Sequence, residues 1–328
     1  MVIFKFEPLY KTRPWGGSFI ERQFNRKIIP ESSHVGESWE IVDRPEDQSI
    51  ISEGDYKGHT LRKIILENCH DIMGPNWNQN ARFPILVKWL DCKERLSLQV
   101  HPPKKIAKLL GGQPKTENWY IANTTENSGL FIGFKKATDP EVFQKALKDG
   151  KAESLCFRTT SSKGDSILVE SGRIHAIDKG NLILEIQQNS DTTYRVYDWG
   201  RVGLDKKPRK LHINESLKSI NFKDIKPKLI KNNKDIKQLE LANCENFRII
   251  KYIFSKFTEF LVKKENIECI LLHLVEGKMK INEMTVNKGE QVMSPYFSAC
   301  KVNILEDSVL LITDHFVNQQ NLDSALSN

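Results

Sequence analysis

The chain consists largely of short apolar segments that are separated by turn residues. Gly, Asn, Asp and Pro lie between segments that are rich in Ile, Leu, Val and Phe. Runs of this kind predict β-strands, and many short strands at close spacing are typical of a β-sandwich or a jelly-roll barrel. We therefore expect a mainly β chain with two jelly-roll β-barrel units and a few short helices. The expected strands cover 82–91, 129–134, 165–170, 181–188, 192–199, 247–254, 267–277, 278–286 and 309–316.

Helical patterns are few. Residues 59–74 have apolar side chains at helical spacing and end at Gly74. Residues 138–150 begin with a capping residue and a proline and end at Gly150, which is the usual asymmetry of helix ends. Residues 103–112, PKKIAKLLGG, predict a short helical turn at most.

A polar stretch divides the strands into two groups. Residues 223–238 are rich in Lys, Asp and Asn, as expected of a solvated linker. We therefore expect one domain over residues 1–222, a linker over 223–238, a second β domain over 239–316 and a tail over 317–328.

Composition argues against several classes of protein. Lys5 and Glu7 interrupt the stretch where a signal peptide needs an apolar core, and every apolar run is far shorter than the roughly 20 residues that span a bilayer. The six cysteines are scattered, without a C-x-x-C pair, which argues against a thiolate zinc site or a disulfide framework. We expect a cytoplasmic protein without a membrane partner.

The formal net charge of +7 is spread along the chain. Its densest basic stretch, FKDIKPKLIKNNKDIKQ, lacks interleaved aromatic residues. No nucleic-acid partner is expected from such a pattern.

The stretch RLSLQVHPP, residues 95–103, alternates between apolar and polar residues. Because side chains alternate across a strand, Ser97, Gln99 and His101 share one face. One interpretation is a surface strand with this face in water, and the other is a face that points into a barrel.

A second histidine follows a strand in GDSILVESGRIHAIDKG, residues 164–180. The strand ends in Glu170-Ser171-Gly172, and His175 lies three residues further on. This spacing predicts a hairpin that delivers an imidazole to a barrel interior. The stretch is similar to the second sequence motif of the cupin barrels, G-x5-P-x-G-x2-H, with Glu170 in place of the proline. The alternative is a hydrogen-bonded histidine of the core or surface.

Charged residues interrupt several apolar runs. Lys88 lies in ILVKWL, Glu185 in LILEIQQ and Arg195 in TYRVYDW, and a charge in such a run must be paired, metal-bound or exposed. Glu185 and Arg195 on paired strands would form an internal salt bridge, which is the structural alternative. Lys115 and Glu117 lie on one face of an extended segment, either as a surface ion pair or as part of a site.

Four of these residues together make a plausible ligand set for a divalent metal. Gln99, His101, Glu117 and His175 offer two nitrogens and two oxygens. With glutamate as the single anion, a bound Zn²⁺ keeps a net positive charge and can polarise substrate oxygens.

The sequence resembles the type I mannose-6-phosphate isomerases in their short bacterial form. The likeness covers residues 1 to about 220, in order, and a weaker likeness to a second cupin half follows in LVEGKMKI…VNKGEQVMSP. It implies a catalytic zinc-binding cupin domain over 1–222 and a cupin-like domain without metal over 239–316. The motifs are LSLQVHP, PKTENWY, GRIHAI and LEIQQNSDTTYRVYDWGR, together with RPWGG, GESWEI and RKLHI.

The resemblance implies roles for single residues. One Zn²⁺ per chain is expected on Gln99, His101, Glu117 and His175. Arg195 matches the catalytic arginine and Glu185 an active-site acidic residue, while Lys88, Ser97 and Lys115 match positions associated with the substrate. Glu185 is the first candidate for the base, with a zinc-bound hydroxide, Asp191 or an imidazole as alternatives.

The implied reaction interconverts mannose 6-phosphate and fructose 6-phosphate through an enediol(ate). The expected partner is therefore a small phosphosugar, and the expected assembly is a monomer or homodimer. Two alternatives remain: an Fe(II) cupin oxygenase, and a non-catalytic sugar-phosphate-binding or regulatory cupin.

Overall fold

A computed structural model describes residues 2–28, 34–262 and 268–316. The expected tail, 317–328, lies outside the described residues. Contacts divide the chain into two units, of which unit 2 comprises 10–38 and 88–232, and unit 1 comprises 1–9, 39–87 and 233–328. This division differs from the expected one, which keeps residues 1–222 together, because strand pairing is long-range. For example, β1 (Phe4–Lys5) pairs with β19 (Gln291–Ser294) in unit 1.

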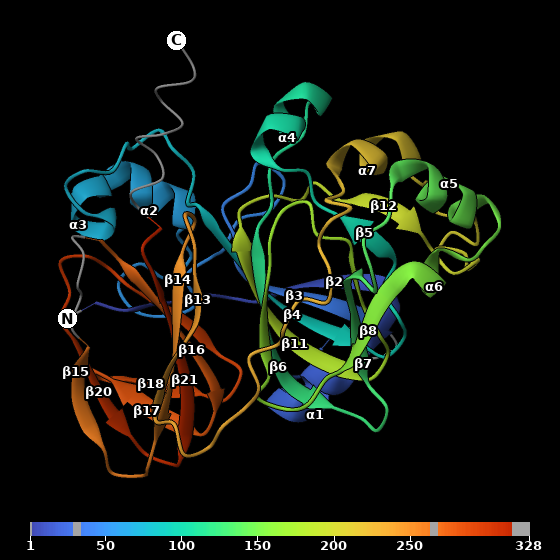
Figure 1. Ribbon diagram of the computed structural model, residues 1–328. Helices are drawn as coiled ribbons and strands as arrows, with labels where there is room; N and C mark the ends of the chain where they lie inside the picture. The colour runs from blue at the N-terminus through green and yellow to red at the C-terminus, as the bar shows by residue number, and fades with distance from the viewer. Residues whose placement is uncertain (1, 29–33, 263–267, 317–328) are drawn as a thin grey trace. The chain divides into compact units, whose positions relative to one another are not determined.

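Unit 2 is built mainly on two sheets (Figure 1). We call the six-stranded sheet β2-β3-β4-β11-β6-β9 the β11 sheet and the five-stranded sheet β12-β5-β10-β7-β8 the β5 sheet. The strands of the β11 sheet are β2 (Leu9–Gly17), β3 (Val35–Ile41), β4 (Ile85–Cys92), β11 (Asn181–Gln188), β6 (Glu117–Thr124) and β9 (Ser166–Val169). Those of the β5 sheet are β12 (Tyr194–Tyr197), β5 (Leu98–Val100), β10 (His175–Ile177), β7 (Gly129–Phe134) and β8 (Cys156–Thr160).

The two sheets of unit 2 pack face to face through an apolar cluster. The β11 sheet contributes residues such as Leu90, Ile121 and Ile183, and the β5 sheet contributes Ile132 and Ile177. Because side chains alternate along a strand, Lys88, Glu117 and Glu185 lie on the same faces as these core residues. The interior between the sheets is therefore apolar at one part and polar at another.

Helices cover the outer face of the β5 sheet (Figure 1). α5 begins where Asp139 Oδ1 accepts a hydrogen bond from Val142 N at 2.8 Å, with Pro140 in its first turn. Its Phe143 packs with Phe131 and Phe134 of β7. The helices are α5 (Pro140–Lys148), α6 (Ala152–Leu155) and α7 (Ile213–Ser219), and unit 2 also has α1 (Phe19–Phe24) and α4 (Lys104–Leu110).

Unit 1 contains a six-stranded sheet, β1-β19-β16-β21-β14-β13, and a four-stranded sheet, β15-β20-β17-β18. Apolar residues of both sheets form one core, for example Leu272, Leu310 and Val302. Its further elements are β13 (Gln238–Asn243), β14 (Arg248–Phe254), β15 (Glu259–Val262), β16 (Ile270–Glu276), β17 (Lys278–Ile281), β18 (Met284–Asn287), β20 (Cys300–Ile304), β21 (Ser308–Asp314), α2 (Leu61–Glu67) and α3 (Cys69–Met73).

The mainly β fold with few short helices is confirmed. The strands form open sheets where closed barrels were expected. Within the described ranges the strands pair into four open sheets. The stretch 223–238 is tied to unit 2 by two isolated bridges, Phe134 with Ile225 and Ser166 with Ile230, so it is more than a solvated linker.

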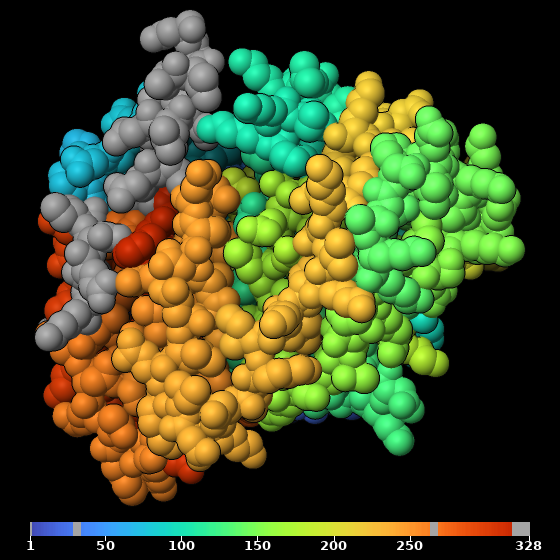
Figure 2. Space-filling view, in the orientation of Figure 1, coloured from blue at the N-terminus to red at the C-terminus, as the bar shows by residue number. Residues whose placement is uncertain are grey.

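Three local predictions differ from the structure. The helix expected over 59–74 is two helices, because Asn68 ends α2 and precedes α3. The turn expected at 103–112 is the helix α4, which stands out from the surface in Figure 2 and leaves Leu109 80% exposed. The predicted hairpin at 164–180 is wrong, because β9 pairs with β6 whereas β10 pairs with β5 and β7.

No disulfide joins any of the six cysteines in the described part of the chain. Among the residues that the structure describes, no helix has the length and apolar character needed to cross a bilayer.

Candidate metal centre and adjoining pocket

The polar face of RLSLQVHPP points between the sheets of unit 2. Leu98 and Val100 belong to the apolar cluster on the outer, helix-covered face of the β5 sheet. Ser97 and Gln99 therefore face inward, and Ser97 Oγ donates to Gln99 Oε1 at 3.4 Å. His101 follows on the same side and is 1% exposed. The interpretation as a surface strand is wrong.

Strand register brings His175 and Arg195 beside Gln99. β10 and β12 flank β5, and both His175 and Arg195 are directly opposite Gln99. One row across the β5 sheet thus carries a guanidinium, an amide and an imidazole. Gln99 Nε2 lies 3.2 Å from His175 Nε2.

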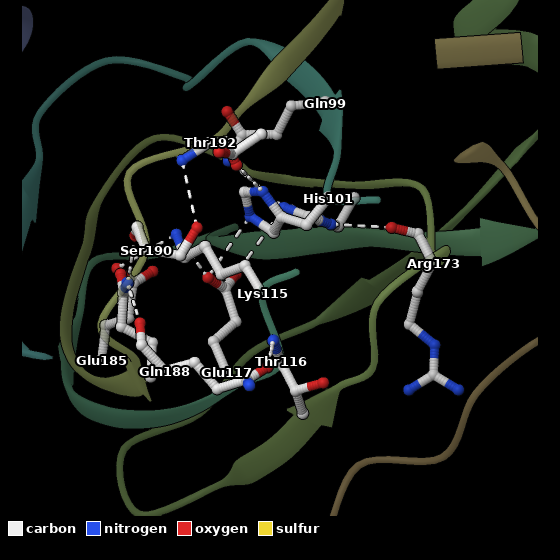
Figure 3. Close-up of polar contacts among 12 residues, drawn as sticks. Gln99, His101, Lys115, Thr116, Glu117, Arg173, Glu185, Gln188, Ser190 and Thr192 are labelled. Atoms are coloured by element: carbon white, nitrogen blue, oxygen red, sulfur yellow. Dashed lines mark hydrogen bonds and ion pairs between the residues drawn. The ribbon is translucent and has the colours of Figure 1, made fainter. Parts of the chain in front are cut away.

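Glu117 faces the two histidines from the β11 sheet. Its Oε2 lies 3.4 Å from His101 Nε2, and its Oε1 lies 3.6 Å from His175 Nε2. The three side chains are buried, and their ligand atoms all lie within 4.8 Å of one another. Figure 3 shows the carboxylate of Glu117 pointing at the His101 ring.

Backbone carbonyls set the orientation of both imidazoles. His101 Nδ1 is 2.9 Å from the Thr192 carbonyl oxygen, and His175 Nδ1 is 2.9 Å from that of Arg173 (Figure 3). Because a carbonyl oxygen can only accept, each Nδ1 carries the proton and each Nε2 keeps its lone pair. Both lone pairs therefore point toward Glu117.

The cluster has the donor atoms that a divalent metal needs. His101 Nε2 and Glu117 Oε1 are buried and have no hydrogen-bond partner among the described residues, whereas Glu117 Oε2 is paired with Lys115 Nζ. Leaving His101 Nε2 and Glu117 Oε1 unsatisfied is costly, and a cation bound between the imidazoles and the carboxylate would satisfy both. Two imidazoles and a carboxylate suit Zn²⁺ or Fe²⁺.

The electrostatics keep these groups in their metal-binding protonation states. Burial lowers the pKa of His175 to about 3, and burial together with Lys115 lowers the pKa of His101. Burial by itself would raise the pKa of Glu117, but the charge of Lys115 holds that pKa well below its usual range. Neutral imidazoles and an ionised carboxylate are the forms that bind a metal.

Lys115 and Glu185 extend the polar cluster. Lys115 Nζ lies 2.7 Å from Glu117 Oε2 and 3.8 Å from Glu185 Oε1. Because Lys115 is 4% exposed, the pair is not the surface ion pair offered as the alternative. Glu185 Oε1 also lies 3.7 Å from Lys88 Nζ. Burial and Glu117 raise the pKa of Glu185, and the two lysines oppose that rise.

Glu185 and Arg195 do not form the internal salt bridge that was the structural alternative. β11 pairs with β6, so Glu185 is opposite Trp119, whereas Arg195 lies on β12 of the other sheet. Arg195 Nη1 instead donates to the Lys210 carbonyl oxygen at 2.9 Å, and its buried Nε has no hydrogen-bond partner among the described residues. Burial and nearby Arg209 lower the pKa of Arg195.

A pocket of about 570 Å³ adjoins the cluster within unit 2. Its lining is rich in charged and polar groups, and it includes every residue expected to meet the substrate. These are Lys88, Ser97, Gln99, Lys115, Glu185, Asp191 and Arg195. His101, Glu117 and His175 lie behind this lining and reach it through Gln99 and Lys115.

The sequence did not single out several residues that shape this site. Arg13 and Arg209 line the pocket. Arg13 is held by Glu37 at 2.9 Å, and Arg209 by Asp198. Trp119 Nε1 donates to Glu185 Oε2 at 3.0 Å. The charge of Asp198 inside TYRVYDW could have indicated an ion pair at this site. The contacts of the Thr192 and Arg173 carbonyls could not be predicted, because every residue has a backbone carbonyl.

The sequence is similar to those of known proteins. The family model "Phosphomannose isomerase type I, catalytic domain" matches residues 3–133. Mannose-6-phosphate isomerase ManA of Bacillus subtilis is 33% identical over 300 residues, which covers 89% of this chain and 92% of that protein. A mannose-6-phosphate isomerase of Streptococcus mutans is 36% identical over 204 residues, or 62% of this chain and 63% of that protein.

Solved structures agree with the sequence relatives. The crystal structure of the mannose 6-phosphate isomerase from Bacillus subtilis superposes with a TM-score of 0.84 at 29% identity, covering 96% of this chain and all of that one. A zinc-bound mannose 6-phosphate isomerase has the same fold, with a TM-score of 0.76 at 16% identity and coverage of 95% and 99%. This chain therefore belongs to the type I phosphomannose isomerase family.

Proposed function

We propose that this chain is a zinc-dependent aldose–ketose isomerase that interconverts mannose 6-phosphate and fructose 6-phosphate. One observation carries the proposal: a buried His101–Glu117–His175 cluster with unsatisfied donor atoms adjoins a pocket lined by Lys88, Arg195 and further charged groups. The names of the family and of the relatives supply the substrate.

The metal would be held by His101, Glu117, His175 and Gln99. The two Nε2 atoms and the Glu117 oxygens already face one another. Gln99 directs its amide nitrogen toward His175 and its oxygen toward Ser97. An amide can present either end, so a half-turn would offer the oxygen to the metal and an N–H to the Ser97 hydroxyl. Bound zinc would polarise sugar oxygens and acidify the adjacent C–H bond.

The reaction moves one proton between carbons and one between oxygens. A base takes the proton from C2 of mannose 6-phosphate and returns it to C1, while the hydroxyl proton passes from O2 to O1 through an enediol(ate). Glu185 is our first assignment for the base, because its carboxylate is buried, lines the pocket and has a raised pKa, which suits a group that must accept a proton. Asp191, which also lines the pocket, is the alternative.

Cations of the chain would act on the rest of the substrate. Arg195 has a buried Nε without a partner and would stabilise the negative charge that develops on the sugar oxygens. Lys88 and Ser97 would bind the phosphate, and Lys115 would hold Glu117 and orient the sugar. Binding through the remote phosphate positions the reacting carbons without taking part in the bond changes.

Further parts of this proposal rest on the sequence. We infer that the enzyme works in the cytoplasm, where its cysteine thiols would remain reduced. The monomer or homodimer, the single zinc per chain and the absence of metal from the C-terminal β domain also stay predictions.

A coupled assay with purified protein and mannose 6-phosphate tests the proposal. We expect fructose 6-phosphate to form, the activity to disappear on chelation and zinc to restore it. Zinc binding without turnover would contradict the proposal and favour a binding or regulatory protein. Iron-dependent oxygen uptake without isomerisation would favour the oxygenase.

A further inference from the structure

The indole of Trp119 links Glu185 to the histidine cluster. Trp119 and Glu185 are directly opposite each other on β6 and β11, and both side chains face the interior between the sheets. Trp119 Nε1 donates to Glu185 Oε2 at 3.0 Å. The same ring contacts His175 edge-on, with ring centroids 5.3 Å apart and an interplanar angle of 79°.

The two oxygens of Glu185 have different partners. Oε2 is held by the indole, whereas Oε1 lies 3.7 Å from Lys88 Nζ and 3.8 Å from Lys115 Nζ, two residues that line the pocket. A carboxylate held only by lysines could rotate, because lysine is a flexible point charge. The rigid, buried indole removes this freedom, since its N–H has one fixed direction.

We propose that Trp119 is a positioning residue for the isomerase reaction, which holds Glu185 Oε2 so that Oε1 faces the substrate. The proposal rests on the proposed function. Trp119 itself is buried and does not line the pocket. It therefore acts through Glu185, while the edge of its ring also contacts His175.

The test is Trp119→Phe, with Trp89→Phe as the matched control. Trp89 is also a fully buried tryptophan of the β11 sheet, but it is adjacent to Lys88 in β4 and so faces away from the pocket. For Trp119→Phe we expect kcat to fall about 10- to 100-fold, as loss of a positioned group does. KM should change by less than about threefold, because phosphate binding is untouched. Zinc per chain should not change, and Trp89→Phe should retain kcat within about twofold.

Two further measurements separate positioning from packing. In a Glu185→Gln background, Trp119→Phe should lower kcat by no more than about twofold, because Glu185→Gln has already removed the base that the indole positions. In the wild type, the indole N–H of Trp119 should give one of six tryptophan signals in ¹⁵N NMR, and Glu185→Gln should shift it. This second measurement does not require Trp119→Phe to fold.

Several results would overturn the inference. Unchanged kcat in Trp119→Phe, full additivity with Glu185→Gln or an unshifted indole signal would each remove the link to Glu185. Loss of zinc from Trp119→Phe would make the indole a structural support of the metal site. A wild type without isomerase activity would instead refute the proposed function, so the two failures are distinguishable.

Discussion

Gln99 and His175 are directly opposite each other on β5 and β10, although 76 residues separate them in the chain. Their facing nitrogens lie 3.2 Å apart. Because β5 is only three residues long, its register with β10 decides whether the amide and the imidazole meet. This pairing places one side of the proposed metal centre on the β5 sheet, with Glu117 of the β11 sheet on the other.

Gln99 is predicted to contribute directly to zinc affinity. Gln99→Ala should lower the affinity by at least about tenfold, because one neutral oxygen ligand is lost. Ser97→Ala, which removes a hydrogen-bond partner of Gln99 and no ligand atom, should lower the affinity less than Gln99→Ala does. Competition with a chromophoric chelator measures both. Equal zinc affinity in wild type and Gln99→Ala would exclude the amide as a ligand.

Arg195 is predicted to act on turnover. Arg195→Ala should lower kcat by about 100- to 1,000-fold, which is typical for loss of an oxyanion-stabilising donor. The zinc content should stay unchanged, because Arg195 contacts none of the three clustered ligand atoms. Arg158→Ala is the control, since Arg158 pairs with Asp178 and does not line this pocket. An Arg195→Ala protein that loses its zinc would show that the role is wrongly assigned.

Lys88 is predicted to act on substrate capture. Lys88→Ala should raise KM for mannose 6-phosphate about 10-fold or more, because a charged hydrogen bond to phosphate contributes about 1.5–3 kcal/mol. Steady-state kinetics at fixed zinc give KM and kcat separately. If KM stays the same and only kcat falls, Lys88 serves Glu185, 3.7 Å away, and not the phosphate.

His273 is predicted to make unit 1 sensitive to acid. Its Nδ1 lies 2.6 Å from Gln291 Oε1 and its Nε2 lies 2.9 Å from Thr313 Oγ1. Burial lowers the pKa of His273 to about 4, against the opposing hydrogen bond to Gln291. Between pH 6.5 and about 4 the unfolded chain binds a proton that the folded chain does not. The contribution of His273 to the free energy of unfolding is therefore fully present above pH 6.5 and is lost as the pH is lowered through this window.

Urea unfolding at several pH values checks the effect of His273. Between pH 7 and pH 5, the free energy of unfolding of the wild type should fall by about 2 kcal/mol more than that of His273→Gln. Parallel pH profiles of the two proteins would show that this imidazole is not a neutral buried group.

The sequence predicted the elements with strong alternation or clear ends. β11 and β7 match their apolar runs, and α5 matches its Asp139 cap and closing Gly150. β2 was not predicted, because LYKTRPWGG contains a proline, lacks alternation and is largely unburied. The break between α2 and α3 was not predicted either, because apolar spacing continues across Asn68.

The residues of the candidate site could be predicted from the sequence, but the contacts between their side chains could not. Periodicity placed Ser97, Gln99 and His101 on one face. The contact of Trp119 with Glu185 depends on the register of β6 with β11, and the orientation of the histidines depends on backbone carbonyls. Neither the strand register nor these backbone contacts can be deduced from residue types. Long-range pairings, such as Phe4 with Met293, also explain why the two units could not be read as consecutive segments.

Zinc titration of metal-free protein, followed by the isomerisation of mannose 6-phosphate, tests the central claim most directly. The predicted curve starts near zero activity, rises in proportion to added zinc and ends at about one zinc per chain, as a single catalytic site requires. Full activity in the metal-free protein, or zinc binding at this stoichiometry without any turnover, would contradict the claim.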